Sequence, residues 1–336
     1  MNPTRAAAAD LITRCWSTQV IHAAVSLKVP DRLAQGTTSS AALARDLSTD
    51  PRATFRLLRA MATLGVCVHS GDDRFELTQT GHYLRTDVPE SLVPLAFHWG
   101  ARTWPALAHL EQSVQSGKPW SLGGREGFFS MAQRPKDAEV LNRSMASLTL
   151  LVAQAIVDAY DFSRFRTAID LGGGYGALLS VLLKKHPHLR GGSADLAYME
   201  SDATAFLGRE GVSERARFIP TDFFKSVEAG ADCYLLKYII HDWDDADSIA
   251  ILRNTRIAAG ERGTVLLVEQ LVPEETESNT QHAAVVRSDI QMMVSTGGME
   301  RTATEYRELL AHAGLDLLRI VPSASQFSLI EAQAAR

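Results

Sequence analysis

Hydrophobic residues in the first part of the chain repeat at the spacing of helices. Between residues 6 and 29 apolar side chains recur every three or four positions, and Pro30 ends the pattern. The same spacing predicts a short helix over about 40–47 and another from 51 to 64, where Asp50 is suited to cap the first turn. This part of the chain is therefore expected to be mainly helical.

A small hairpin is predicted directly after these helices. Residues 66–69 and 74–77 are typical of strands and flank the turn-like sequence Ser-Gly-Asp-Asp. Three helices followed by a hairpin indicate a winged helix, a fold that often binds DNA. Three arginines would share one face of the last helix: Arg52, Arg56 and Arg59. Residues 1–85 hold ten Lys or Arg against seven Asp or Glu, a net charge of +3, so a solvated helix face is the favoured interpretation.

The pattern of hydrophobic positions changes near residue 167. From there, short apolar runs typical of buried strands alternate with helical segments. The predicted strands are 167–171, 191–195, 216–220, 232–238 and 264–269. Because strands and helices alternate, this part is predicted to be an α/β domain built on a parallel sheet.

These patterns divide the chain into three parts. Residues 1–100 are expected to form the winged-helix-like domain, and residues 166–336 the α/β domain. The segment 101–165 is interpreted as a helical linker. Its bulky apolar side chains include candidates for the wall of a pocket that takes a flat aromatic ligand.

Charge and cysteine content narrow the class of protein. The 336 residues carry 34 Lys and Arg and 39 Asp and Glu, so the net charge of −5 disfavours nucleic acid and anionic membranes as partners. No uninterrupted apolar run approaches the ~18 residues of a membrane span, and residues 1–16 lack the apolar stretch of a signal peptide. The three cysteines lie far apart, as expected of reduced thiols. These features predict a cytoplasmic protein.

A glycine-rich loop follows the first strand of the α/β part and precedes a helical stripe of leucines. Its sequence from Asp170 is Asp-Leu-Gly-Gly-Gly-Tyr-Gly. Glycines let the backbone approach a ligand closely, and the start of a helix offers free N–H groups, so the loop predicts a nucleotide site. Together with Asp195, the loop also satisfies the dinucleotide fingerprint, which leaves an NAD-dependent oxidoreductase as an alternative.

Polar side chains stand at or just past the ends of the predicted strands, where open α/β sheets bind their ligands. These side chains are Asp170, Asp195, Asp222, His241 and Glu269. A carboxylate at Asp195 would accept hydrogen bonds from both hydroxyls of a ribose. At Asp222 and Phe223, an acid could accept from an adenine amino group while an aromatic ring covers the base.

The motifs together resemble one known family. The loop at 170–176 looks like the cofactor loop of class I S-adenosylmethionine (SAM)-dependent methyltransferases. Residues 221–224 (Thr-Asp-Phe-Phe), 236–243 (Leu-Lys-Tyr-Ile-Ile-His-Asp-Trp) and 297–302 (Gly-Gly-Met-Glu-Arg-Thr) narrow the resemblance to small-molecule O-methyltransferases of the caffeic-acid and hydroxyindole type, in their bacterial natural-product branch. The resemblance implies a Rossmann-like class I methyltransferase domain behind a winged-helix-like dimerisation domain, and hence a homodimer.

The resemblance also implies a role for each matching residue. The cofactor, SAM, which leaves as S-adenosylhomocysteine, would be bound by six residues: Gly172, Gly174, Asp195, Asp222, Phe223 and Lys237. His241 would act as general base toward a hydroxyl of a phenol-like natural product, with Glu269 and Glu300 beside its imidazole. Candidates for the acceptor pocket are Asp242, Met145 and Met292. No metal ion is implied.

Two further alternatives stay open at this point. A relative of these enzymes could keep SAM but hydroxylate or decarboxylate a polycyclic aromatic compound, although the presence of His241, Glu269 and Glu300 favours methyl transfer. The acceptor itself is also open, because phenazines, polyketides and simple phenols all present a suitable hydroxyl group.

Overall fold

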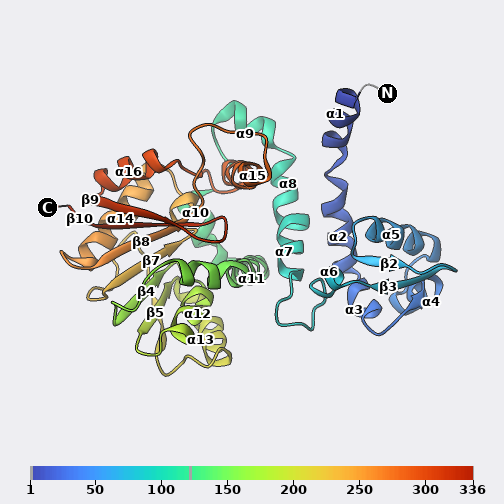
Figure 1. The fold of residues 1–336 in the computed structure, drawn as a ribbon, viewed down its shortest axis with the longest axis horizontal. Helices are drawn as coiled ribbons and strands as arrows, with labels where there is room; N and C mark the ends of the chain where they lie inside the picture. The colour runs from blue at the N-terminus through green and yellow to red at the C-terminus, as the bar shows by residue number, and fades with distance from the viewer. Residues whose placement is uncertain (1–2, 121–122, 336) are drawn as a thin grey trace. The chain divides into compact units, whose positions relative to one another are not determined.

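The computed structural model describes residues 3–120 and 123–335. The chain divides into two compact units at residues 105 and 106, each with a hydrophobic core of its own (Figure 1). Most of the segment 101–165 belongs to the second unit, and the three-part division with a separate linker stays a prediction.

The first unit is mainly helical and holds a three-stranded antiparallel sheet of order β1-β3-β2. Its core contains Leu33, Leu43, Leu58 and Phe75. Its elements are α1 (Pro3–Thr13), α2 (Trp16–Ser26), α3 (Val29–Leu33), β1 (Thr38–Ser39), α4 (Ser40–Leu47), α5 (Pro51–Thr63), β2 (Cys67–His69), β3 (Arg74–Leu77), α6 (Gln79–His82), α7 (Val93–Phe97) and the π-helix η1 (His98–Thr103).

Most of the local predictions for this unit are confirmed. The side chain of Asp50 accepts a hydrogen bond from the backbone N–H of Ala53 and so caps α5, and β2 pairs with β3 in a hairpin. The continuous helix predicted over 6–29 is wrong, because the structure divides this stretch among α1, α2 and the start of α3. Lys28 has a left-handed backbone there, with φ of 57°, and Pro30 lies in the first turn of α3, where its missing N–H costs nothing.

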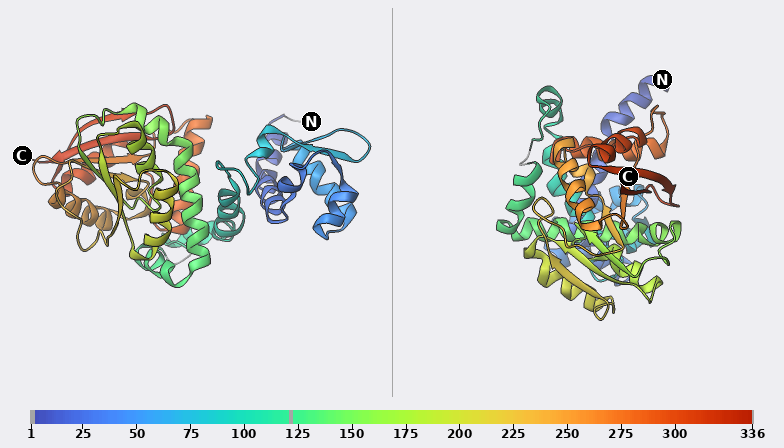
Figure 2. Two further views of the ribbon diagram at one scale, coloured as in Figure 1. Left: turned by 90° about the horizontal axis from the view of Figure 1, so that it is seen from below. Right: turned by 90° about the vertical axis from the view of Figure 1, so that its left-hand side faces the viewer.

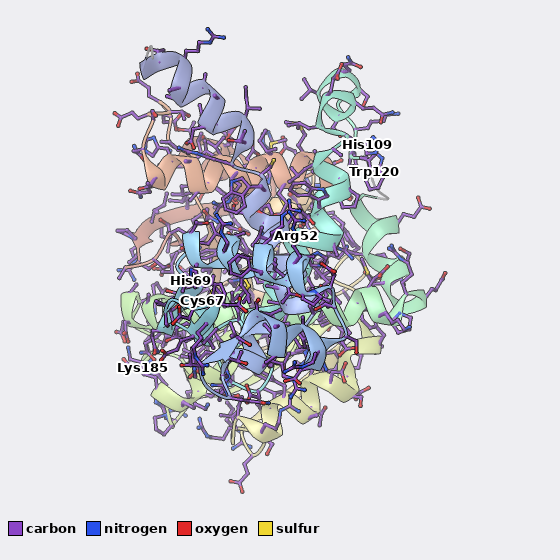
Figure 3. The ribbon with its side chains drawn as sticks, turned by 90° about the vertical axis from the view of Figure 1, so that its right-hand side faces the viewer. Arg52, Cys67, His69, His109, Trp120 and Lys185 are labelled. Carbon is purple, nitrogen blue, oxygen red and sulfur yellow. The ribbon has the colours of Figure 1, made fainter. Side chains whose placement is uncertain are left out.

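The arginines of α5 lie on a solvated face. Arg52, which Figure 3 labels, is exposed, as are Arg56 and Arg59. The guanidinium carbon of Arg59 lies 5.7 Å from the ring centroid of Phe55 on the same helix. The favoured interpretation of this face, as a solvated surface, agrees with this exposure.

The second unit is built on a seven-stranded sheet of order β6-β5-β4-β7-β8-β10-β9. The first five strands in this order pair in parallel, and the chain ends with an antiparallel pair beside β8. The strands are β4 (Thr167–Leu171), β5 (Arg190–Asp195), β6 (Ala216–Pro220), β7 (Cys233–Lys237), β8 (Thr264–Glu269), β9 (Leu315–Pro322) and β10 (Ser328–Ala334). All five strands predicted from the apolar runs are confirmed.

Helices cover both faces of this sheet (Figures 1 and 2). Alternate residues of β7 point to opposite faces: Tyr234 and Leu236 pack with α14 and α16, whereas Cys233 and Leu235 pack with α11 and α12. The described helices from residue 104 onward are α8 (Trp104–Leu107), which spans the boundary between the units, α9 (Leu110–Ser116), α10 (Gly124–Phe129), α11 (Pro135–Ala159), α12 (Ala177–Lys185), α13 (Glu200–Arg209), α14 (Asp245–Ala259), α15 (Thr280–Ser295) and α16 (Ala303–His312), with the 3-10 turns η2 (Ser130–Gln133), η3 (Ala197–Met199) and η4 (Ile240–Asp242). This is a doubly wound α/β fold.

Helix α11 is, among the described helices, the one that is long and apolar enough to cross a membrane by length and composition. One such helix is weak evidence of a membrane span. Ala153, Ile156 and Val157 on its inner face belong to the core beneath the sheet, next to α12. We therefore describe α11 as a core helix of the α/β unit.

Candidate active site

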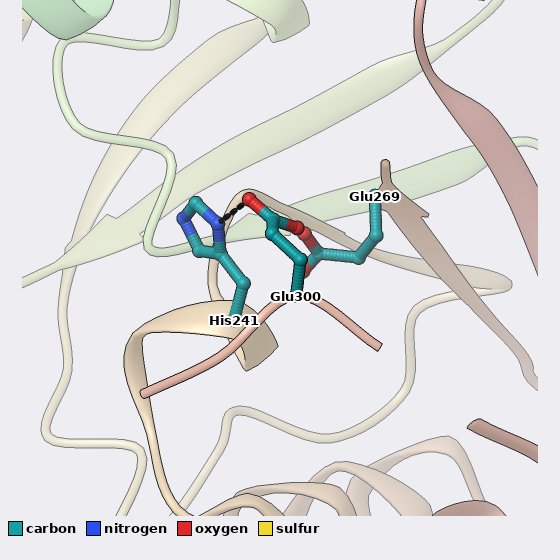
Figure 4. Close-up of side chains that lie close together, drawn as sticks. All are labelled: His241, Glu269 and Glu300. Atoms are coloured by element: carbon teal, nitrogen blue, oxygen red, sulfur yellow. Dashed lines mark hydrogen bonds and ion pairs between the residues drawn. The ribbon is translucent and has the colours of Figure 1, made fainter. Parts of the chain in front are cut away.

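The imidazole of His241 lies just past the carboxyl end of β7, in the short turn η4. Tyr238 makes this turn possible, because its left-handed backbone, with φ of 55°, redirects the chain out of the strand. His241 is only 4% exposed, and its Nδ1 lies 2.8 Å from Oε1 of Glu300 (Figure 4). The structure thus brings together two residues that are 59 positions apart in the sequence.

Glu269, at the end of β8, holds the backbone that leads into His241. Its Oε1 accepts hydrogen bonds from the backbone N–H groups of Ile239, at 3.1 Å, and Ile240, at 2.9 Å. The side chain is fully buried. Glu269 therefore fixes the turn rather than bonding directly to the imidazole.

Two residues of α15 support Glu300, and the sequence analysis missed both. The hydroxyl of Ser288 donates to Oε1 of Glu300 at 2.6 Å, and the backbone N–H of Glu300 donates to Oδ1 of Asp289 at 2.9 Å. These bonds hold the carboxylate so that the same oxygen faces Nδ1 of His241. No local sequence signal connects α15 to this carboxylate.

Arg301 ties the same segment to the His241 turn. Its side chain is 1% exposed and donates to the carbonyl oxygens of Ile240, at 3.1 Å, and Trp243, at 3.0 Å, as well as to Asp245 at 2.7 Å. Its own carbonyl accepts from the backbone N–H of Val272 at 3.0 Å, just beyond Glu269. Arg301 thus links the three segments that carry His241, Glu269 and Glu300. The sequence motif contains this arginine, but only the structure reveals its contacts.

Gly298 lies directly against the backbone of the His241 turn. A Cβ atom at this position would collide with the carbonyl oxygen of His241 and with the backbone of Asp242 and Trp243. A side chain would therefore push the segment carrying Glu300 away from the imidazole. The Gly-Gly pair at 297–298 was the sequence signal of this close approach.

Burial and neighbouring charges shift the pKa values of the groups in this cluster. Burial alone would lower the pKa of His241, but the negative charges of Glu300 and Asp242 and the hydrogen bond to Glu300 raise this pKa to about 9. Oδ1 of Asp242 lies 3.9 Å from Nε2, on the other side of the ring from Glu300. Burial raises the pKa of Glu269 to about 7.

The cluster also has the donor atoms of a cation site. One atom each from His241, Glu269 and Glu300 lies within 4.8 Å of the other two, and nitrogen with carboxylate oxygen is a donor set that divalent metals use. The expectation of a reaction without a metal ion stays a prediction.

The glycine-rich loop between β4 and α12 forms a cradle at the same edge of the sheet. Gly172 and Gly174 have positive φ angles of 68° and 57°, and a Cβ on Gly172 would collide with Ile239, two residues before His241. Asp195 braces the loop: Oδ2 accepts from the backbone N–H of Gly174 at 2.9 Å, and Oδ1 from that of Leu196 at 2.7 Å. Such a backbone cradle before the start of α12, braced by the carboxylate at the end of β5, fits the adenosyl and methionine parts of SAM.

Phe223 lies beside this cradle. Asp222, the residue before Phe223, follows the end of β6. Phe223 approaches Gly172 and packs edge-to-face against Trp243, with 6.0 Å between ring centroids. Asp222 accepts from the backbone N–H of Phe224 at 3.1 Å and pairs with Lys225 at 3.0 Å. The adenine-binding role of both residues stays a prediction.

Lys237 and the two methionines have contacts of other kinds. The buried ammonium of Lys237 donates to the hydroxyl of Thr149 on α11 at 3.0 Å, and burial lowers its pKa to about 8. Met145 is half-buried on α11, and Met292 is buried on α15, where the hydroxyl of Thr296 contacts its sulfur. The cofactor role of Lys237 and the pocket roles of Met145 and Met292 stay predictions.

Comparisons with known proteins agree with this geometry. Residues 107–316 match the family model of the O-methyltransferase domain, and residues 9–87 that of the O-methyltransferase dimerisation domain. The chain is 38% identical to O-demethylpuromycin-O-methyltransferase of Streptomyces alboniger, over 96% of this chain and 88% of the relative. It is 36% identical to the phenazine O-methyltransferase PhzM of Lysobacter antibioticus, over 96% and 94%.

Solved structures give the same result. The crystal structure of LaPhzM superposes with a TM-score of 0.93 at 35% identity, covering 99% of both chains. The mitomycin 7-O-methyltransferase MmcR superposes with a TM-score of 0.88 at 32% identity, covering 100% of both. NcsB1 from neocarzinostatin biosynthesis, solved with SAM and 2-hydroxy-5-methyl naphthoic acid, gives 0.79 at 30% identity, covering 94% and 95%.

These matches confirm the predicted family and fold class. The winged-helix-like region is the family's dimerisation domain, and the matches give no support to the hydroxylase or decarboxylase alternative. The chain therefore belongs to the SAM-dependent O-methyltransferases, as an enzyme with the family's dimerisation domain ahead of its methyltransferase domain.

Proposed function

We propose that this protein methylates a hydroxyl group of an aromatic natural product, with His241 as the general base. The observation that carries the proposal is the hydrogen bond of 2.8 Å between Nδ1 of the buried imidazole and Glu300. With Nδ1–H donated to the carboxylate, the lone pair of Nε2 is the one that can accept a proton.

The chemistry follows from the groups around His241. A phenol with an ordinary pKa near ~10 is mostly protonated at neutral pH and is then a poor nucleophile. SAM, when bound, supplies a methyl group already activated by its sulfonium. Nε2 of His241 takes the proton from the acceptor oxygen, and Glu300 stabilises the imidazolium that forms. Asp242, 3.9 Å from Nε2, adds negative charge on the acceptor side.

The cofactor would be held by residues of three strand ends. Gly172 and Gly174 would let the backbone approach the methionine part, and the carboxylate of Asp195, which accepts from the N–H of Gly174, would also accept from the ribose hydroxyls. Asp222 and Phe223 would contact the adenine. Lys237 donates to Thr149 on α11, which packs on the sheet. We propose that Lys237 lies beside the cofactor.

The acceptor class is proposed from the relatives. Their names give O-demethylpuromycin, a phenazine, 3-amino-4-hydroxybenzoate and a dihydroxynaphthoate as what they methylate. These compounds share an aromatic or aryl-bearing skeleton with a hydroxyl group. Asp242, Met145 and Met292 are proposed to line the pocket for such a ring, since Met side chains adapt to flat apolar ligands.

The assembly and location are proposed on the same basis. The dimerisation domain supports a homodimer, and the net charge of −5 fits a cytoplasmic enzyme without a nucleic-acid or membrane partner. Sedimentation of the full chain at micromolar concentration is expected to give twice the monomer mass of 36.7 kDa. A monomer throughout that range would contradict the proposal.

A methyl-transfer screen tests the proposed reaction. Aromatic hydroxyl compounds are incubated with enzyme and SAM, and products are detected by the mass of one added methyl group. We expect His241→Ala to bind SAM in calorimetry as the wild type does, but to lose about 10²–10⁴-fold in turnover on any accepted compound. A variant with near wild-type turnover would remove His241 from the mechanism.

A further inference from the structure

The short helix α10 carries Arg125, whose guanidinium meets both an aromatic ring and a carboxylate. The guanidinium carbon lies 3.7 Å from the ring centroid of Phe224. Nε and Nη2 of the same side chain donate to Oδ1 of Asp247 on α14, at 3.0 and 2.5 Å. Asp247 is held in turn, because its backbone N–H donates to the carboxylate of Asp244, the cap of α14. Arg125 therefore joins α10, the segment after β6 and the start of α14.

Phe224 belongs to an aromatic cluster that reaches the cofactor cradle. Its ring packs edge-to-face against Trp243, with 4.8 Å between the centroids, and its centroid lies 5.2 Å from that of Phe223. Phe128 of α10 also contacts Trp243, with 5.1 Å between the centroids. Phe223 is the member of the cluster whose ring approaches Gly172. The cluster thus connects α10 with the glycine-rich loop.

The contact of Arg125 with this cluster is made at the surface. The side chain of Arg125 is 50% exposed and that of Asp247 24%. An ion pair so exposed adds little to stability, and a cation over a ring adds a modest amount at such a site. The hydrogen bond to Asp247 and the negative charges of Asp222 and Asp244 raise the pKa of Arg125, so its guanidinium stays charged. Its role is therefore better sought in what it positions than in the stability of the fold.

We infer that Arg125 is a positioning residue for the adenine half of the cofactor: it holds Phe224, and through Phe224 the ring of Phe223, in the orientation that covers the base. The inference rests on the proposed adenine-binding role of Asp222 and Phe223. The backbone of Phe223 is fixed separately, because its carbonyl oxygen accepts from the side-chain amide of Asn254 at 2.8 Å. The freedom left to the two rings is rotation about their side-chain torsions. A cation over the face of Phe224 restricts this rotation.

The inferred role concerns binding of the cofactor rather than the chemical step. An interaction that is equally strong in the bound state and in the transition state changes KM and leaves kcat alone. We expect Arg125→Gln to raise the KM for SAM and the Kd for S-adenosylhomocysteine about 3- to 10-fold. The kcat at saturating SAM should stay within about 2-fold of the wild-type value. A loss of fold stability alone would not produce this division between KM and kcat.

Calorimetry of the full-length enzyme with S-adenosylhomocysteine tests the inference without an acceptor. Arg125→Lys keeps a cation that can lie over Phe224 and pair with Asp247, so it should restore much of the affinity that Arg125→Gln loses. Arg217→Gln is the matched control, because it removes an exposed arginine that pairs with Glu228 near the start of β6. This control should bind as the wild type does. Wild-type affinity in Arg125→Gln, or the same loss in both Gln variants, would overturn the inference.

A second variant tests whether Arg125 acts through the ring of Phe224. Phe224→Leu should also weaken binding, and adding Arg125→Gln to it should then cost little more, because the two residues act as one unit. Fully additive losses would overturn the inference.

A smaller ligand tests which half of the cofactor is affected. The compound 5′-methylthioadenosine contains the adenine and ribose of SAM but lacks its amino-acid part. Arg125→Gln should weaken this ligand and S-adenosylhomocysteine by the same factor, and a loss confined to S-adenosylhomocysteine would overturn the inference. Failure of methyl transfer on every phenol would contradict the proposed reaction and leave these affinities as they are.

Discussion

The phenol ring of Tyr238 lies flat against the imidazole of His241, with 4.2 Å between the ring centroids and 6° between the ring planes. The amide of Gln270 donates to the Tyr238 hydroxyl, so the ring is anchored at its far end. The backbone of Tyr238 is left-handed, a conformation that costs roughly 1–2 kcal/mol in a residue with a side chain. The packing of this ring must offset that cost, and it restricts the imidazole to one plane.

Removing this ring should therefore slow the reaction. Tyr238→Ala frees the imidazole to tilt, and we expect turnover to fall about 10- to 100-fold, with little change in the affinity for SAM. Tyr238→Phe keeps the ring stack but loses the hydrogen bond from Gln270, so its turnover should fall much less. Equal losses in the two variants, measured by initial rates and calorimetry, would show that the ring stack does not position His241.

The raised pKa of His241 predicts the pH dependence of the rate. Since the free enzyme needs a neutral imidazole, kcat/KM should rise with pH and level off near the pKa of about 9. Glu300→Gln removes the nearest negative charge, so the inflection should move down toward the ordinary value of 6.5. An inflection that stays in place in this variant, in a full pH–rate profile, would contradict the assignment.

The same pKa shift predicts a change of stability with pH. Folding raises the pKa of His241 from 6.5 to about 9, so the native state binds the proton more tightly than the unfolded state. This contribution to the free energy of unfolding is complete below pH 6.5 and is lost as the pH rises through about 9. The Tm of the wild type and the Tm of His241→Gln, plotted against pH, should differ in slope across this interval. Parallel plots would argue against the raised pKa of His241.

Arg301 should matter for stability as well as for rate. Arg301→Met keeps the apolar stem but removes the nearest donor from the carbonyl oxygens of Ile240 and Trp243, which keep only longer bonds such as those of 3.4 Å from the Ser248 hydroxyl. This loss should cost about 2–4 kcal/mol. Arg253→Met is the matched control, because Arg253 is exposed on α14 and donates to the carbonyl of His312 alone among the bonds of the described residues. Calorimetric unfolding should show a clear loss for the first variant and almost none for the second.

Two glycines offer a test of the close contact with the His241 turn. Gly298→Ala places a Cβ against the carbonyl of His241 and should destabilise the enzyme by about 1–3 kcal/mol and lower its turnover. Gly208→Ala, at an exposed position of α13 with open space around it, should be neutral or stabilising by up to about 1 kcal/mol. Similar unfolding temperatures for both variants would mean that the turn can move aside.

Much of the fold follows from the sequence because periodicity is local. Apolar runs such as 264–269 identify buried strands, and the order strand, glycine loop, helix places Gly172 and Asp195 at one sheet edge. The antiparallel pair β9 and β10 has no place in the predicted alternation, since its pairing with β8 joins distant segments. The break near Lys28 was also missed, because a left-handed residue interrupts an otherwise helical pattern.

The sequence analysis named candidate site residues but not the contacts between them. His241, Glu269 and Glu300 were identified, and the structure brings them together. The supports Ser288, Asp289 and Arg301 act through hydrogen bonds to segments 11 to 61 residues away, and no spacing rule in one sequence encodes such distances. They follow only from the way α15 and the 297–302 segment cross over the sheet.

The clamp formed by Arg301 limits how this enzyme can be recombined with its relatives. Its side chain donates hydrogen bonds to the carbonyl oxygens of Ile240 and Trp243, and its own carbonyl accepts from the N–H of Val272. The preceding residue, Glu300, contacts the imidazole of His241. A chimera that takes residues 238–248 from one parent and 297–302 from another would combine a turn and an arginine segment from different proteins. The hydrogen bonds between the two segments would then no longer be matched. Exchanges confined to α9 through α11 leave the contacts of Arg301 in one piece.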